Sequence, residues 1–385
     1  MHFCIPPYIN KRQTIFMIRK HFILFTFGLL LFAAIPLKTL FPNSNNVNIE
    51  KRDMKKKPSF HRINETLSLH HKIKEYTKEY EQYYNDNYVL KNRFIELYNS
   101  LKLITKVSPL EKKVIIGQDE WLFLGDEHSS IVNETLGFKP LSQEELSAIR
   151  TSVLEKKAFC DSLGIPFFIT VAPDKHSIYS EHFPLKKISA SRLEQVDELL
   201  KQTDVNYIDI LDTLRTEKNR LPLYYKNDSH WNYNGAWLAY TKIFKTIQQG
   251  CSTIHCLTLE DVNIKSEPFT DLDLSNMISL KVCEYIDVYY PKISPEINTM
   301  EDEPHPGFIN LVRYHAKSSS YNGKIVIYGD SFSKYTYLWI SASVGETFFC
   351  QGVGGIYFDK EQIIQEKPDA VLYEIVEREI ENIVN

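Results

Sequence analysis

The sequence has few cysteines and no surplus of either charge. It holds 6 cysteines among 385 residues and no C-x-x-C pair, which excludes a disulfide-framework protein and gives no sign of a zinc knuckle or dithiol redox motif. The 45 Lys and Arg residues nearly balance the 49 Asp and Glu residues, for a net charge of −4. Such a balance gives no broad attraction to nucleic acid, and we expect no nucleic-acid partner.

The rest of the composition is that of an ordinary globular protein. Hydrophobic residues make up 43% and charged residues 24%, which excludes a mainly disordered or collagen-like chain. The length is sufficient for two or three domains and a large core. Aromatic residues reach 13%, which favours a core rich in Tyr and Phe, with stacking platforms for sugar rings as the alternative.

A hydrophobic run at residues 22–37 follows a basic N-terminal stretch. We interpret it as an uncleaved signal anchor, because the Ala-Ala-Ile-Pro at 33–36 is not a clean small-x-small cleavage site. A cleaved signal peptide and a buried core helix are the alternatives. The basic tail would stay in the cytoplasm, although the Lys-rich stretch at 51–57 opposes this orientation. The prediction is a single-pass membrane protein with the bulk of the chain outside the cytoplasm.

Three regions follow from the pattern along the chain. Residues 1–42 are the predicted cytoplasmic tail and signal anchor. Residues 43–106 are a linker followed by amphipathic helices, because apolar residues recur there at helical spacings. Residues 107–385 form the predicted catalytic domain. Within it, residues 251–310 carry eleven acidic residues against three lysines, and we interpret them as an excursion with a solvated acidic surface or, less simply, a binding role.

Strands and helices alternate in the catalytic domain. Apolar runs predict buried strands at 165–172, 324–329 and 370–375, with a further strand at 205–210. Ser142 with Glu145 forms a capping-box pattern for a helix that ends at Gly164. Further helices are expected near 189–202, 234–248 and 332–343, and a hairpin at 114–125. This alternation predicts a three-layer α/β/α domain with a mostly parallel sheet.

A serine stands where open α/β folds place their sites. Gly329-Asp330-Ser331-Phe332 directly follows a predicted buried strand and precedes a predicted helix. Ser331 would therefore lie at the carboxyl edge of the sheet, with its own N–H directed at an incoming oxyanion. A plain helix N-cap is the alternative role.

Two Asp-x-His patterns offer a base for this serine. Both Asp174-Lys175-His176 and Asp228-Ser229-His230 put an acid two residues before a histidine, as an orienter and a general base require. Spacing alone does not choose between them. A metal site at either is less favoured, because no further ligands follow at ligand spacing. We expect no metal and no cofactor.

Six stretches spread along the chain carry a family resemblance. The chain resembles the SGNH-hydrolase-like family of alginate O-acetylation proteins, AlgJ and AlgX. The matching stretches are YEQYYNDNYVLKNRFIELYNSLK at 80–102, VIIGQDEWLFLGD at 114–126, APDKHSIYSEHFP at 172–184, YYKNDSHWNYNGAWLAY at 224–240, IVIYGDSFS at 325–333 and PDAVLYEIVER at 368–378.

The resemblance implies roles for particular residues. It makes Asp228 and His230 the catalytic Asp-x-His pair and Ser331 the nucleophile, within a flavodoxin-like SGNH fold of permuted motif order behind an N-terminal membrane helix. Glu377 and Arg378 are family signatures without an assigned role. The G-x-N-D block that usually supplies an oxyanion asparagine is missing. Candidates for the second oxyanion or substrate contact are Asn234, Gly352, Gly354 and Lys175.

The activity that the resemblance implies is acetyl transfer to sugar hydroxyls. We expect an extracytoplasmic polysaccharide O-acetyltransferase with a Ser-His-Asp triad and an acetyl-serine intermediate. Its partners would be a polysaccharide acceptor and a membrane-bound O-acyltransferase that delivers acetyl. A glycan acetylesterase needs the same residues, and a non-catalytic glycan-binding scaffold could keep the same fold.

Overall fold

The computed structural model describes most of the chain after residue 111. The described residues are 55–59, 69–87, 94, 97–99, 101–102, 108, 110, 112–127, 129–300, 309–318, 320–353 and 356–384. The hydrophobic run at 22–37, predicted to be a signal anchor, lies outside them. Among the described helices, none combines the length and apolarity that a membrane span requires.

The chain divides into two compact units, Met1–Tyr98 and Asn99–Asn385. Helix α2 (Leu69–Asn87) belongs to the first unit and falls within the region where amphipathic helices are predicted. The second unit holds the sheet and the helices around it.

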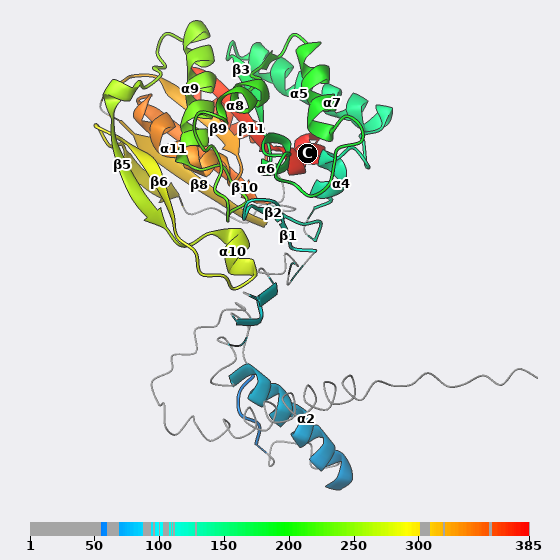
Figure 1. Ribbon diagram of the computed structural model, residues 1–385. Coiled ribbons are helices and arrows are strands. Elements are labelled where there is room, and N and C mark those ends of the chain that lie inside the picture. Colours follow the sequence, from blue (N-terminus) through cyan, green and yellow to red (C-terminus); the bar gives the residue numbers. More distant parts are fainter. Residues whose placement is uncertain are drawn as a thin grey trace, which may run out of the picture. The chain divides into compact units, whose positions relative to one another are not determined.

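A seven-stranded sheet organises the described part of the second unit (Figure 1). Its first five strands run parallel and the last two are antiparallel, so the prediction of a mostly parallel sheet is confirmed. The order across the sheet is β4 (Asn206–Tyr207), β3 (Phe167–Ala172), β11 (Ala370–Val376), β9 (Lys324–Gly329), β10 (Glu346–Val353), β8 (Ile309–Lys317) and β7 (Glu296–Met300).

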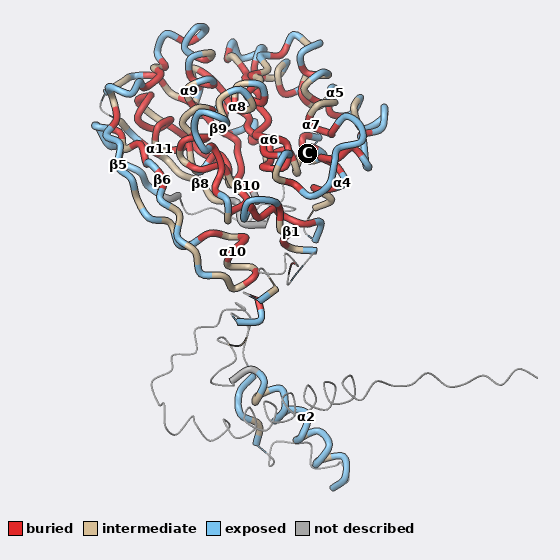
Figure 2. Tube along the Cα trace, in the orientation of Figure 1, coloured by how far each residue is buried: buried red, intermediate tan, exposed pale blue. Residues whose placement is uncertain are grey.

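The central strands are the apolar runs that the sequence marks. Every residue of β3 and β11 is buried, and so is nearly all of β9. Figure 2 shows this buried region under a shell of exposed helix surfaces and loops. A strand buried on both faces requires covering layers on both sides.

Helices provide those two layers. Tyr373 and Glu374 point to opposite faces of β11 because side chains alternate along a strand. Lys156 of α5 (Gln143–Ser162) lies 5.7 Å from the Tyr373 ring, whereas Ser333 of α11 (Ser333–Ala342) lies beside Glu374. Helix α9 (Tyr233–Gly250) packs on α11. The three-layer α/β/α architecture is therefore as predicted.

Local signals place several of these elements. The capping box of Ser142 and Glu145 is present at the start of α5, and a second one, Ser191 with Glu194, starts α7. The remaining elements of this layer set are α4 (Ile131–Thr135), α6 (Lys175–Ile178), α7 (Arg192–Lys201), α8 (Leu211–Glu217), α12 (Lys360–Glu366) and the 3₁₀ helix η4 (Glu377–Val384).

Two short antiparallel pairs lie outside the main sheet. Strands β1 (Val114–Ile116) and β2 (Leu122–Leu124) form the predicted hairpin. Strands β5 (Val262–Phe269) and β6 (Glu284–Pro291) pair within the acidic excursion, with η3 (Leu259–Asp261) before them and α10 (Asp273–Met277) between them. The described residues 251–300 of the excursion are thus an ordered part of the domain, and they include β7 of the main sheet.

Candidate active site

The nucleophile candidate sits on a tight turn between β9 and α11. A Cβ on Gly329 would lie 2.1 Å from Oγ of Ser333, so only glycine lets the strand end this close to the helix. Oδ1 of Asp330 accepts from the N–H of Phe332 at 2.8 Å, and Oδ2 accepts from the N–H of Val376 at 2.6 Å. These two bonds fix the turn to the end of β11 and leave Ser331, half-buried, at the carboxyl edge of the sheet.

A loop between Tyr224 and Trp231 brings the histidine to this serine. Nε2 of His230 lies 2.9 Å from Oγ of Ser331, and Nδ1 lies 2.8 Å from Oδ1 of Asp228. Asp228 therefore fixes Nδ1 as the protonated nitrogen, which leaves Nε2 to accept from the serine hydroxyl. The structure brings the three sequence-predicted residues together in the order that a nucleophile, a base and an orienter require.

The surroundings keep Asp228 ionised. Its side chain is 7% exposed and that of His230 is 18% exposed. Burial alone would raise the pKa of Asp228, but the hydrogen bond and charge of His230 and the N–H of Asp273 lower it overall. An ionised orienter stabilises the imidazolium that forms when the serine gives up its proton.

Lys175 donates hydrogen bonds to the main chain of this loop. Its side chain is 1% exposed, and Nζ donates to the carbonyls of Tyr225 at 3.0 Å, Lys226 at 3.1 Å and Asp228 at 2.5 Å. Burial lowers the pKa of Lys175 to about 8, against the opposing charges of nearby carboxylates. All three bonds go to main-chain oxygens, so Lys175 positions the segment that carries Asp228.

The second Asp-x-His pattern has different partners. Asp174 accepts from both the main chain and the guanidinium of Arg378, and its own N–H donates to Glu377 at 2.9 Å. His176 is 3% exposed, its Nε2 lies 2.9 Å from the carbonyl of Leu124, and burial lowers its pKa to about 3. Asp174 and His176 therefore make structural contacts in the core. Glu377 and Arg378 are the hydrogen-bond partners of Asp174.

The oxyanion candidates have different outcomes. The amide of Asn234 donates to the carbonyl of Pro222 at 3.2 Å and accepts from Tyr289 at 3.0 Å, so its side chain is engaged away from Ser331. Gly352 is buried in β10, one residue past the partner of Gly329 in the β9 register. Gly354 lies outside the described residues.

Asp273 is a neighbour of the histidine that the sequence did not indicate. It is the first residue of α10, and its Oδ2 lies 3.7 Å from Nδ1 of His230. Burial and the charge of Asp228 raise the pKa of Asp273. Its position in the acidic excursion is the one sequence signal for Asp273, and that signal does not single it out among the eleven acidic residues there.

Asp228, His230 and Asp273 are the described residues grouped closely enough to hold a metal ion. Each offers one ligand atom, and these atoms lie within 4.8 Å of one another. The same atoms are hydrogen-bonded within the cluster: Oδ1 of Asp228 to His230, and Oδ2 of Asp273 to the hydroxyl of Ser229. Ligand atoms from two of the three residues are thus already engaged in hydrogen bonds.

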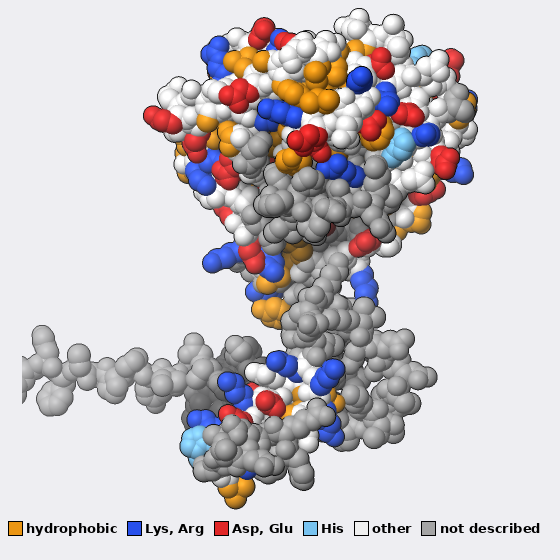
Figure 3. All heavy atoms as spheres, turned by 180° about the vertical axis from the view of Figure 1, so that it is seen from behind, with side chains coloured by type: hydrophobic (Ala, Val, Ile, Leu, Met, Phe, Trp, Pro, Cys, Tyr) orange, Lys and Arg blue, Asp and Glu red, His pale blue; other side chains and the backbone are white. Residues whose placement is uncertain are grey.

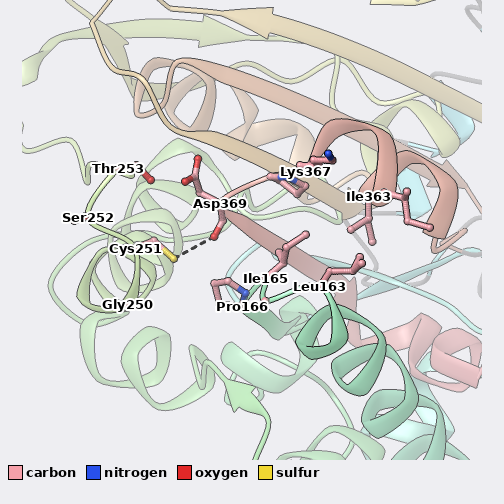
Figure 4. Close-up of a pocket in the computed structure, with 13 residues that line it drawn as sticks. Leu163, Ile165, Pro166, Gly250, Cys251, Ser252, Thr253, Ile363, Lys367 and Asp369 are labelled. Carbon is pink, nitrogen blue, oxygen red and sulfur yellow. Dashed lines mark hydrogen bonds between the residues drawn. The ribbon is translucent and has the colours of Figure 1, made fainter.

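A pocket of about 580 Å³ lies at the other end of the sheet (Figure 4). Pro166 and Asp369, which line it, directly precede β3 and β11, whereas Ser331 follows β9. Because these strands are parallel, the pocket opens at the amino edge and the serine lies at the carboxyl edge. None of the predicted site residues lines this pocket.

Comparisons with known proteins agree with this fold. Residues 114–301 match the family model of the SGNH hydrolase-like domain of acetyltransferase AlgX. The probable alginate O-acetylase AlgJ of Pseudomonas syringae pv. tomato is 25% identical over 181 residues, covering 45% of this chain and 43% of that protein. The protein of the same name from Pseudomonas fluorescens is 26% identical over 178 residues, covering 45% of this chain and 42% of that protein. The chain thus matches less than half the length of these relatives.

A solved structure extends the likeness in fold. The structure of Bacillus cereus PatB1 with a sulfonyl adduct has a TM-score of 0.53 and 16% identity, and it covers 69% of this chain and 97% of that chain. At that identity the likeness concerns the fold alone. The predicted resemblance to AlgJ and AlgX and the predicted SGNH-hydrolase-like α/β fold are confirmed.

Proposed function

We propose that this chain, with its AlgX-type SGNH hydrolase-like domain, is an extracytoplasmic polysaccharide O-acetyltransferase. The observation that carries the proposal is the hydrogen-bonded line from Asp228 through His230 to Ser331, at 2.8 and 2.9 Å. The family match to an acetyltransferase domain and the names of the curated relatives support acetyl as the transferred group.

The chemistry takes two steps with the same residues. In the first, Oγ of Ser331 attacks the acetyl carbonyl of a donor while Nε2 of His230 takes the serine proton. The donor's leaving oxygen departs with that proton and acetyl-serine remains. In the second, His230 takes the proton of a sugar hydroxyl, whose oxygen attacks the acetyl carbonyl. The bond from that carbonyl to Oγ of Ser331 breaks, and His230 gives the proton to the departing Oγ.

Charge stabilisation at the turn completes the mechanism. Among the hydrogen bonds of the described residues, none uses the main-chain N–H of Ser331, so this donor is available to the tetrahedral oxyanion. One such donor contributes roughly 2.7–4 kcal/mol. Gly352, at the carboxyl end of the neighbouring strand, is our candidate for the second donor.

The proposal extends to the setting of the reaction. The hydrophobic run at 22–37 would anchor the chain in the inner membrane, with the catalytic domain in the periplasm beside a membrane-bound O-acyltransferase that supplies acetyl. The acceptor would be a polysaccharide. On the face shown in Figure 3, acidic and basic side chains are interspersed among the described residues, so the described part of that face offers no stripe of one charge to an anionic glycan.

The test is acetyl transfer from a chromogenic acetyl ester to a panel of oligosaccharides that includes alginate fragments, with mass spectrometry of both products. Ser331→Ala and His230→Ala should each lower turnover by about 10⁶, or roughly 8 kcal/mol. Ser180→Ala, which alters an exposed serine, serves as the matched control and should leave the rate unchanged.

The outcomes separate three functions. Acetylated sugar that disappears in both variants supports the transferase. Release of free acetate with every sugar tried would show an acetylesterase, in which water replaces the sugar hydroxyl. Turnover no greater than that of Ser331→Ala would overturn both and leave a glycan-binding scaffold.

A further inference from the structure

The loop that carries Asp228 and His230 is held from one side by the acidic excursion. Oε1 of Glu284, on β6, accepts from the N–H of Asn227 at 2.8 Å, and Oε2 accepts from the N–H of Lys226 at 3.0 Å. The carbonyl of Asn227 in turn accepts from the N–H of Ser275 at 3.0 Å. The excursion therefore fixes the first half of the loop through main-chain bonds.

Asp273 holds the second half, where the chemistry lies. Its main-chain N–H donates to Oδ2 of Asp228 at 2.7 Å. Its Oδ1 accepts from the N–H of Ser229 at 2.7 Å, and its Oδ2 accepts from the hydroxyl of the same serine. Asp273 thus contacts the orienter and the residue between orienter and base, while its Oδ2 lies 3.7 Å from Nδ1 of His230.

We propose that Asp273 is a second orienting carboxylate for His230, placed by the acidic excursion so that two acids, rather than one, face the protonated Nδ1. It is a positioning residue, because it acts on the histidine and does not touch the reacting atoms. The inference deepens the proposed function and rests on it for the role of Ser331. It assigns the excursion a part in the reaction in place of a merely solvated surface.

The charges around the histidine make this arrangement distinctive. Two carboxylates on the Nδ1 side favour the imidazolium that forms as the serine is deprotonated, since opposite charges a few ångströms apart attract each other. When Asp228 loses its charge, Asp273 remains within a small side-chain movement of the same N–H. The charged groups that face the cluster are Asp174, Lys175, Asp330 and Arg378.

The experiment measures how fast Ser331 reacts with phenylmethanesulfonyl fluoride in the full-length chain. In that reaction Oγ of Ser331 bonds to sulfur, fluoride leaves, and His230 takes the hydroxyl proton. Labelling is followed by mass spectrometry, so it needs neither an acetyl donor nor an acceptor. Failure of the acetyl-transfer assay therefore leaves this measurement intact, and the two failures are distinguishable.

The variants form a double-mutant cycle of isosteric changes. Asp273→Asn should slow labelling about tenfold and Asp228→Asn about 10²-fold, which is less than the roughly 10⁴-fold loss typical of a triad with a single orienting acid. The double variant should lose about 10⁴-fold, more than the product of the single losses, because each acid partly replaces the other. Asp271→Asn, an exposed acid two residues away, is the matched control.

A charge-conserving variant separates orientation from packing. An asparagine at position 273 still offers an oxygen to the N–H of Ser229, whereas a glutamate keeps the charge near His230. Labelling of Asp273→Glu faster than that of Asp273→Asn supports the proposal. If Asp273→Asn slows labelling by the same factor in the unaltered chain and in Asp228→Asn, the proposal is overturned and the contact is purely structural.

Two further outcomes would also overturn it. Loss of labelling with a chelator and recovery with a divalent ion would make Asp228, His230 and Asp273 a metal site. Absence of labelling in the unaltered chain would remove the nucleophile, and with it both the proposed function and the role of Asp273.

Discussion

Glu374 presents a buried acid whose protonation should govern how stability depends on pH. It lies in the central strand β11 with 0% exposure, beside the hydroxyl of Ser333. Burial, and then the charge of Asp330, raise the pKa of Glu374 from 4.5 to about 8. The informative perturbation is Glu374→Gln, which keeps the shape and removes the titration.

The sign follows from proton binding in the two states. Unfolded chains release this proton near pH 4.5, whereas the folded chain keeps it to about pH 8. The free energy of unfolding is therefore larger at low pH and falls as pH rises between these values. A pKa difference of about 3.5 corresponds to about 5 kcal/mol in total. Between pH 5 and pH 8 the loss amounts to roughly 3–4 kcal/mol, a large share of a typical unfolding free energy of about 5–15 kcal/mol.

The assay is urea unfolding of the full-length chain, followed by tryptophan fluorescence at several values between pH 5 and pH 8. Relative to the unaltered protein, the unfolding free energy of Glu374→Gln should rise by roughly 3–4 kcal/mol across this range. Groups that do not interact with Glu374 titrate equally in both proteins, so their contributions cancel. Glu198→Gln, an exposed acid on α7, should give no such gain. Parallel curves for Glu374→Gln and the unaltered chain would refute the reasoning, because they would mean that folding does not perturb this carboxyl.

Three changes around the loop that carries Asp228 and His230 give further expectations. Asn232→Ala removes the side chain that caps α9 with two hydrogen bonds and should cost about 1–2 kcal/mol in thermal unfolding; no change would show that the cap is redundant. Gly235→Ala would put a Cβ 2.2 Å from the carbonyl of Leu223, whereas Gly250→Ala on the same helix meets nothing closer than 4.0 Å, so only the former should lower the melting temperature. Lys175→Met removes a cation that donates to three carbonyls and should cost about 3–5 kcal/mol, a loss that equilibrium unfolding would detect.

The sequence predicts those parts of the fold whose signals are local. Strands β3, β9 and β11 are buried on both faces, so each is a continuous apolar run. Helices α5 and α7 carry complete capping boxes at their starts. Such features depend on a residue's immediate neighbours and need no knowledge of the tertiary structure.

Strands β7, β8 and β10 were not predicted, because their identity depends on pairing. Strand β8 alternates polar and apolar residues and is intermediate in burial over much of its length, and β10 includes Thr347 and Gln351 among its apolar residues. Both become strands by pairing with each other, with Cys350 opposite Arg313. The same limit hid Asp273, whose importance comes from a loop 45 positions earlier in the chain.

The two Asp-x-His patterns show why spacing alone does not determine chemistry. Asp174 and Asp228 each precede a histidine by two residues, yet their carboxylates have different partners. That of Asp174 pairs with Arg378, whereas that of Asp228 accepts hydrogen bonds from His230 and Asp273. Asp174 is neutralised by Arg378, which lies 204 positions later, and His176 is enclosed by aromatic rings and a main-chain carbonyl, where it stays neutral and has no nucleophile to activate. His230 meets Ser331, 101 positions later, on the open edge of the sheet. A histidine becomes a base through the third group that the fold delivers to it, and a short motif carries no information about that group.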